Sequence, residues 1–380
     1  MMQQLYCPNC GTLNPPNILF CVKCGHPLAR KVCPNCGFQV PANSVHCPNC
    51  GYPFPRRSLA SYRYTLPSSS TYIHSSLRPT GSLTSDLKLV FRMAFKRRPP
   101  IFTPSQAVYQ RLPYATLARS SRYFHYALLA FISGVALAFL VSASTNLVVL
   151  FLPAFIAALI PALLYLYWIK RVDRYEPEPM WLIALAFGWG AASTILAIIP
   201  NEILIPLLGG WMGTAAFVEE PLKILGVYLI SASPWLRGEL NDHLDGLLYG
   251  AAAGLGFGFI ENILYIARGL ALGAPLIIPL RVLTMGMHMF CSGLIGWWMG
   301  YLKVNAIEIR WSTITPALIT AIVVHATWNT MGSLGVVGLL ILLVMGPYLV
   351  FRVHRMAMDA LVDEYYWGFA HGYAPVETVS

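Results

Sequence analysis

Eight long apolar runs between residues 124 and 355 constrain the fold of this chain more than any other feature. Each is close to the ~20 residues that an α-helix needs to cross the hydrocarbon core of a membrane. Of all residues, 56% are hydrophobic and only 11% are charged, which a soluble globular protein would not show. The sequence therefore predicts an all-α polytopic membrane protein with about eight transmembrane helices, at 124–144, 147–169, 181–200, 212–231, 245–266, 282–302, 313–332 and 335–351.

The net charge of +10 is explained by the same membrane. Basic residues cluster before the first apolar run and in a few short loops, where topology signals and lipid headgroups require them. We therefore expect the lipid bilayer, and not nucleic acid, as the partner of this charge.

The distribution of basic residues also predicts an orientation. Residues 1–28 hold no apolar core of signal-peptide length, so we expect the N-terminus to stay in the cytoplasm. Most short-loop basic residues then fall on the cytoplasmic side, and Arg268 and Arg281 are left outside. We predict a multi-pass protein of the plasma membrane, with both termini, including the tail 356–380, in the cytoplasm.

Residues 1–51 contain eight of the nine cysteines in two similar halves. Two cysteines separated by two residues can bind one ion from a tight turn, and two such pairs complete a tetrahedral site. Each half thus resembles a zinc ribbon, and we expect one structural zinc ion in each. Four disulfides are the alternative, but they require an oxidising compartment. The expected ligands are Cys7, Cys10, Cys21, Cys24, Cys33, Cys36, Cys47 and Cys50.

A basic linker, residues 52–123, follows the cysteine module and is expected to be largely disordered. Within it, the segment 86–98 has apolar residues at helical spacing and basic residues on another face. Such a helix suits the anionic inner leaflet of a membrane, and a solvated helix without lipid contact is the alternative. We expect the cysteine module to dock a cytoplasmic protein or to act as a sensor.

Several ionisable residues interrupt the later apolar runs. An ionisable residue at membrane depth costs a few kcal/mol, so it usually faces a protein interior or a water-filled cavity. Counted from the outer ends of four different spans, these residues sit roughly 8–12 Å deep, all in one layer. Independent structural accidents would scatter in depth, so we predict a single site. Its expected members are Glu219, Glu220, Lys223, Glu261, His288, His325 and, one helical turn after His325, Asn329.

Local spacing suggests how the first of these residues are arranged. Glu219 and Lys223 are separated by four positions and can form an ion pair on one helix face. Glu220 lies about 100° away around the helix and is expected to face another partner. Glycines at 250, 254 and 258 predict close helix packing.

The order of these motifs resembles the PrsW family of intramembrane proteases. The resemblance rests on Glu219-Glu220-x-x-Lys223, Phe257-x3-Glu261, His288 and His325-x3-Asn329, with Tyr175-Glu-Pro-Glu-Pro179 and Asp245-Gly-Leu-Leu-Tyr-Gly250. That family is distantly related to the CAAX-prenyl endopeptidases. The resemblance implies that 124–355 is an intramembrane protease domain that cleaves membrane-anchored proteins, anti-sigma factors being the best-known substrate class.

Peptide hydrolysis needs an activated water and a stabilised oxyanion, and two mechanisms fit the residues. In the first, Glu219 or Glu220 is the general base, Lys223 orients one of the pair, His325 with Asn329 donates to the oxyanion, and His288 and Glu261 position the water. In the second, His288, His325 and Glu261 bind a catalytic zinc ion with an open fourth position, and the carboxylate pair again acts as the base. The sequence leaves both open.

The sequence leaves two alternatives to a protease. Buried Glu, His and Lys residues also form proton relays, so a proton-coupled transporter or channel is one alternative. A non-catalytic membrane sensor or scaffold is the other. The transporter predicts an inverted repeat or paired broken helices, and the apolar runs show neither.

Overall fold

The computed structural model describes residues 5–6, 13–14, 30–41, 50, 77–96, 147–173, 178–305 and 307–370, with isolated positions at 125–136. The chain forms two compact units. One comprises residues 1–77, 100–116 and 361–380, and the other comprises residues 78–99 and 117–360.

The first unit contains two short antiparallel hairpins. Strand β1 (Leu5–Tyr6) pairs with β2 (Leu13–Asn14), and β3 (Arg30–Val32) pairs with β4 (Gln39–Pro41). In the second hairpin Gly37 has a φ of 73°, a left-handed conformation that glycine adopts at little cost. Cys33 and Cys36 lie in this turn, so the local chain folds back at the first pair of the expected second ribbon.

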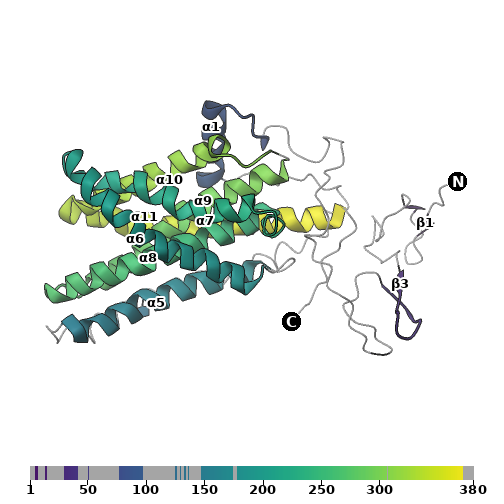
Figure 1. Cartoon of the computed structure of the whole chain (residues 1–380), viewed down its shortest axis with the longest axis horizontal. Helices are drawn as coiled ribbons and strands as arrows, with labels where there is room; N and C mark the ends of the chain where they lie inside the picture. Colours follow the sequence, from purple (N-terminus) through teal and green to yellow (C-terminus); the bar gives the residue numbers. More distant parts are fainter. Residues whose placement is uncertain are drawn as a thin grey trace. The chain divides into compact units, whose positions relative to one another are not determined.

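The second unit is a helical bundle in which long helices lie side by side (Figure 1). Its membrane-type helices and one short 3₁₀ turn are α5 (Leu147–Val172), α6 (Met180–Leu207), η3 (Met212–Thr214), α7 (Ala215–Ala232), α8 (His243–Ala271), α9 (Ile277–Val304), α10 (Trp311–Gly332) and α11 (Gly335–Ala370).

The all-α polytopic fold predicted from the sequence is confirmed by these helices. Within the described residues, five helices are long and apolar enough to cross a membrane: α5, α6, α8, α9 and α11. Helices α7 and α10 occupy two further expected spans. The first expected span, 124–144, lies almost wholly outside the described residues.

Helices α8 and α9 form the centre of the bundle. In their most apolar windows 83% and 89% of residues are buried inside the protein, against 39% for α6 and α11. The two central helices approach closely because glycines face each other's backbone. A Cβ on Gly250 would lie 2.3 Å from Ser292 O, and one on Gly254 would lie 2.3 Å from His288 O. The predicted close packing at 250 and 254 is confirmed, and it brings α8 against α9 at the level of His288.

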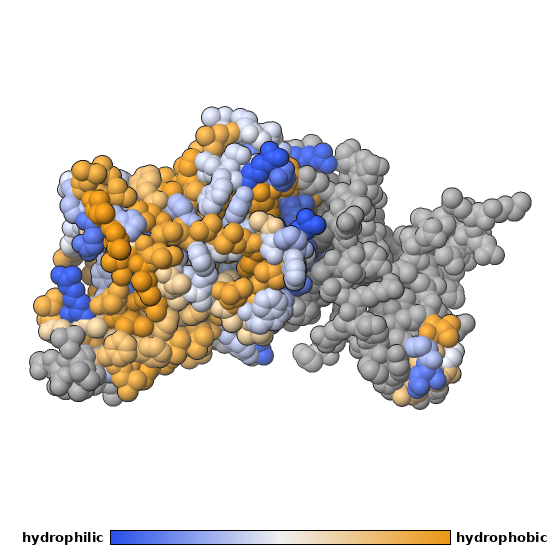
Figure 2. Space-filling view, in the orientation of Figure 1, coloured by the Kyte–Doolittle hydropathy of each residue, from blue (hydrophilic) through white to orange (hydrophobic). Residues whose placement is uncertain are grey.

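The outer surface of the bundle is apolar over much of the face seen in Figure 2. Large hydrophobic side chains on α6 and α11 are widely exposed, among them Ile199 (71%) and Val344 (72%). Contiguous exposure on this scale is unusual in a soluble monomer. It is the surface expected of helices that face lipid.

A further helix, α1 (Leu83–Phe95), overlaps the segment expected at 86–98. It packs against α10, and the ring of Phe95 contacts Phe290 of α9 and Tyr348 of α11. Val90 and Ala94, which belong to the predicted apolar face, are buried. This face is therefore covered in part by protein, which the sequence alone did not indicate.

Candidate active site

Helix α7 supplies two carboxylates and one ammonium to the interior of the bundle. Lys223 Nζ donates to Glu220 Oε1 at 2.7 Å and lies 3.6 Å from Glu219 Oε2. All three side chains are buried. The predicted ion pair of Glu219 with Lys223 is present, but it is longer than the ion pair of Glu220 with Lys223. Residues three apart on a helix are neighbours, as are residues four apart, so Lys223 reaches both carboxylates.

Lys223 also joins α7 to the two central helices. Its Nζ lies 3.0 Å from Nδ1 of His288 on α9, and 4.1 Å from the ring centroid of Phe257 on α8. A lysine ammonium has only protons to donate, so Nδ1 of His288 accepts in this contact. The face of the aromatic ring adds a favourable contact to a desolvated cation.

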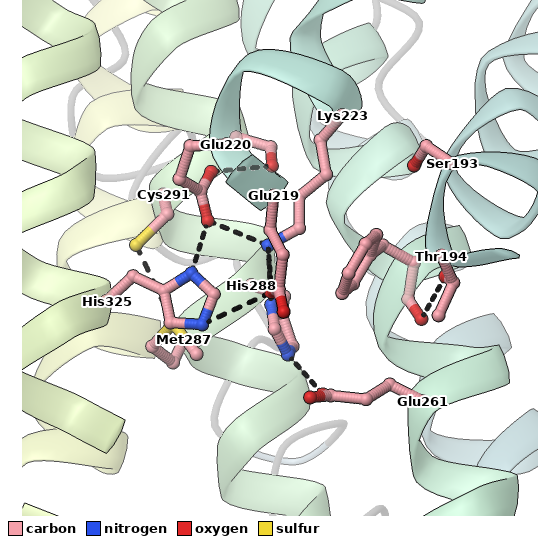
Figure 3. A network of polar contacts seen from close by, with 12 residues as sticks. Ser193, Thr194, Glu219, Glu220, Lys223, Glu261, Met287, His288, Cys291 and His325 are labelled. Carbon is pink, nitrogen blue, oxygen red and sulfur yellow. Dashed lines mark hydrogen bonds and ion pairs between the residues drawn. The ribbon is translucent and has the colours of Figure 1, made fainter. Parts of the chain in front are cut away.

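His325 of α10 is oriented by the same carboxylate pair (Figure 3). Its Nδ1 donates to Glu220 Oε1 at 2.7 Å, and its Nε2 lies 3.5 Å from Glu219 Oε2. Because Nδ1 carries the proton toward Glu220, the neutral ring presents the lone pair of Nε2 toward Glu219. Ser292 of α9 donates to Glu220 Oε2 at 3.3 Å.

Glu261 of α8 binds the other ring nitrogen of His288. Its Oε2 accepts from His288 Nε2 at 2.8 Å and from the guanidinium of Arg281 on α9 at 2.5 Å. Arg281 Nε in turn donates to Asn262 Oδ1 at 2.6 Å. A chain of hydrogen bonds thus runs from the His288 ring through Glu261 and Arg281 to Asn262, which lies on α8 beside Glu261.

These contacts bring six of the seven predicted residues together. Glu219, Glu220 and Lys223 from α7, Glu261 from α8, His288 from α9 and His325 from α10 form one network, which we call the polar cluster. The His288 and His325 rings stand edge to face, 5.0 Å apart. Four helices deliver side chains to one place, as the equal depths in the sequence predicted.

Asn329 differs from its predicted position. Its Nδ2 donates to Met212 O in η3 at 3.4 Å, and among the described residues it bonds to no member of the polar cluster. The side chain lies one turn beyond His325, near the end of α10, where it meets the chain entering α7. Its predicted role beside His325 as an oxyanion donor is not supported by this contact.

Three residues of the site were missed by sequence reasoning. Asn201 of α6 donates to Glu219 Oε1 at 3.0 Å, and Ser292 and Arg281 hold Glu220 and Glu261. Arg281 stood out in the sequence only as a basic residue on the outer side. Asn201 and Ser292 are uncharged and carried no signal that distinguishes them from other polar residues in spans.

The residues fit a divalent metal ion, but not with the ligands first predicted. Glu219, His288 and His325 each offer one ligand atom within 4.8 Å of the others, so Glu219 takes the place assigned to Glu261. Among the residues that the structure describes, Glu219 Oε2 is buried without a hydrogen-bond partner. Two carboxylates also share one ammonium, which leaves negative charge that a cation would offset. Two histidines and a glutamate are a donor set typical of catalytic zinc.

The cysteine module shows part of a second metal site. Cys33, Cys36 and Cys50 place their sulfurs within 4.8 Å of one another. Cys33 Sγ and Cys50 Sγ are 3.6 Å apart, well beyond the ~2 Å of a disulfide bond. These two thiols are therefore not cross-linked to each other. The other five expected ligands, Cys7, Cys10, Cys21, Cys24 and Cys47, lie outside the described residues.

Comparison with known families assigns both regions. Residues 178–352 match the model of the PrsW family intramembrane metalloproteases, and residues 7–51 match the double zinc ribbon. Residues 178–352 thus resemble a PrsW intramembrane protease domain. Every member of the polar cluster lies within the matched range, and the ribbon match covers all eight expected cysteine ligands.

Curated relatives of the PrsW domain are similar over the same part of the chain. Protease PrsW of Bacillus subtilis (strain 168) is 25% identical over 179 residues, which are 46% of this chain and 79% of the relative. Protease PrsW of Clostridioides difficile (strain 630) is 32% identical over 154 residues, 36% and 65% of the two chains. That of Geobacillus kaustophilus is 29% identical, over 37% and 62%. The chain spans somewhat less than two thirds of the last two relatives. No solved structure matches.

Proposed function

We propose that this chain hydrolyses peptide bonds of membrane-anchored proteins at the polar cluster, with a divalent metal ion bound by Glu219, His288 and His325. The observation that carries the proposal is the convergence of these three buried groups from three helices within 4.8 Å. A bound zinc ion would supply a polarised water and a Lewis acid at this point.

The remaining residues of the cluster have separate tasks. Glu220 fixes the tautomer of His325 by accepting its Nδ1 proton, an arrangement common around histidine ligands of metals. Lys223 compensates the charge of the carboxylate pair, and it would give up its contact with Nδ1 of His288 when that nitrogen binds the ion. Glu261 and Arg281 hold the ring of His288 from the opposite side.

Glu220 is also the carboxylate that we assign to proton transfer. Glu219 is committed to the ion in this arrangement, which leaves Glu220 to take a proton from the attacking water. Its Oε1 already accepts two hydrogen bonds, whereas Oε2, within the described part of the chain, accepts only from Ser292, at 3.3 Å. Oε2 therefore keeps the acceptor capacity that a general base needs.

The substrate class follows from the location of the site. The polar cluster is buried among helices that bear apolar outer surfaces, so a substrate must reach it from the bilayer or its outer margin. We propose single-pass proteins cut near the outer face of the plasma membrane, anti-sigma factors being one class, with both termini of the protease in the cytoplasm.

The test compares protein N-termini in membranes and medium from cells that carry the natural chain or the Glu220→Gln variant at equal expression. We expect new N-termini in or just outside spans of single-pass proteins with the natural chain alone. Glu202→Gln, which changes an exposed carboxylate on α6, is the matched control and should preserve these N-termini. Identical N-termini in the natural and Glu220→Gln cells would contradict the proposal.

A further inference from the structure

Helix α1 is capped by its own chain at its start and bound to the bundle at its end. At its start, Asp86 accepts hydrogen bonds from Thr80 N at 2.8 Å and Gly81 N at 2.9 Å. At its end, the guanidinium of Arg352 donates to the backbone carbonyls of Ala94 and Lys96. A cation at these last carbonyls also favours the helix dipole. The position of α1 on the bundle is therefore set by protein contacts.

In this position α1 forms a groove with α10. A cavity of about 450 Å³ is open along the contact of the two helices. Its lining is mostly apolar, with Leu87 and Phe91 from α1 facing Ile319 and Val323 from α10. Phe91 is 55% exposed and Val323 is 58% exposed, so the hydrophobic lining reaches the surface. The groove has the shape and chemistry for a hydrocarbon chain.

One edge of the groove is basic. Lys88, Arg92 and Lys96 repeat every four residues along α1, line the same cavity and are exposed. Where α1 appears in Figure 2, hydrophilic side chains lie beside the apolar surface of the bundle. In the part of the chain that the structure describes, no carboxylate pairs with these three residues. Asp86, the acid within α1, is already engaged by Thr80 and Gly81.

We propose that this groove binds one anionic phospholipid, with its phosphate on Lys88, Arg92 and Lys96 and an acyl chain between α1 and α10. The occupant must offer negative charge beside hydrocarbon, and anionic lipid has both. The apolar span of a substrate protein would fill the hydrocarbon part only and would leave three cations without a partner. The groove lies outside the polar cluster, so this inference does not depend on the proposed function.

The test measures lipid retained by the purified full-length chain. Native mass spectrometry is run with phosphatidylglycerol and with phosphatidylcholine of the same acyl chains. We expect one tightly retained phosphatidylglycerol and weaker retention of phosphatidylcholine. Each basic residue near an anionic surface contributes about a factor of five, so Lys88→Gln, Arg92→Gln and Lys96→Gln together should weaken the affinity about 100-fold.

A matched variant controls for charge alone. Lys170→Gln with Arg171→Gln removes two basic residues at the end of α5 and should leave phosphatidylglycerol retention unchanged. Equal retention of both lipids, or full retention by the triple variant, would overturn the proposal. The thermal unfolding midpoints and zinc contents of all variants must match those of the natural chain, and the charge-preserving Lys88→Arg with Lys96→Arg should keep the lipid.

A crosslink identifies the occupant in the cell. A photoreactive benzoylphenylalanine at position 323 lies on the α10 side of the groove. Irradiation of membranes should join it to phospholipid. A protein adduct at this position would show that a transmembrane segment occupies the groove and would overturn the lipid assignment, as would the absence of any lipid adduct.

Discussion

The cysteine module and the polar cluster both gather metal-ligand side chains, but they do so over very different lengths of chain. Cys33 and Cys50 are 17 residues apart in sequence, whereas Glu220 and His325, in contact across the cluster, are 105 residues apart. A ribbon is expected to bring its ligands together by two tight turns, without help from the rest of the fold. The polar cluster exists only when four helices are correctly packed.

This difference predicts separate sensitivities. A ribbon of about 25 residues lacks a hydrophobic core of useful size and depends on its ion to fold. The bundle has its own packed core, and its site is set by helix contacts. Variants in the cysteine module should therefore leave the polar cluster intact, and variants in the bundle should leave the cysteine module intact.

The largest effect is expected for Glu220→Gln. The amide cannot accept a proton from water, so the cleavage rate should fall about 10²–10⁴-fold, the usual contribution of general acid–base catalysis. Gln keeps a carbonyl oxygen for the hydrogen bond from His325, so the zinc content should be unchanged. A cleavage assay on a reconstituted single-pass substrate measures the rate, with Glu202→Gln as control. A loss below tenfold would remove Glu220 from proton transfer.

A substitution between the central helices should act on the bundle alone. In Gly250→Leu the added side chain meets Ser292 O, where even a Cβ lies at 2.3 Å, and such overpacking costs about 1–3 kcal/mol. Thermal unfolding in detergent should show a lower midpoint, and zinc bound by the ribbons should be retained. Gly188→Leu is the control, because a Cβ there meets nothing within 4 Å. Equal midpoints for the two variants would refute the close approach of α8 and α9.

How far the sequence predicts this site can be judged from individual residues. The members of the cluster were predictable because charged residues in apolar spans are rare and their depths agree. Their partners were not, because depth does not say which way a side chain turns. The sequence therefore predicts Glu261 as a metal ligand where the structure places Glu219 near the two histidines, and it does not single out Asn201 or Ser292. For the cysteine module the spacing alone predicts the ligands, and the structure brings three of them, Cys33, Cys36 and Cys50, together.

A smaller effect is expected for Arg281→Gln. Loss of the guanidinium leaves Glu261 with His288 alone and loosens the ring, and residues that orient a ligand typically contribute 10–100-fold in metal affinity or activity. Titration with zinc should show weaker binding at the bundle site together with slower cleavage. Arg268→Gln, which changes a basic residue near the end of α8, is the control. Slower cleavage without any change in zinc affinity would assign Arg281 to substrate contact instead.

The smallest effect on cleavage is expected for Cys33→Ser with Cys36→Ser. These changes remove half of the ligands of the second ribbon, so about one zinc ion per chain should be lost. Cleavage of a purified substrate should stay within about twofold, because the polar cluster is set by bundle contacts alone. A large fall in cleavage by the purified variant would show that the two regions are coupled.

The most direct test of the account is the zinc content of the purified full-length chain and of its His325→Gln variant. The natural chain should contain about three zinc ions, two in the ribbons and one at Glu219, His288 and His325. His325→Gln should lose about one ion, and combining it with Cys33→Ser and Cys36→Ser should lose about two. A natural chain with about two ions, unchanged by His325→Gln, would contradict a metal site in the bundle and would leave Glu219 and Glu220 as a catalytic pair without metal.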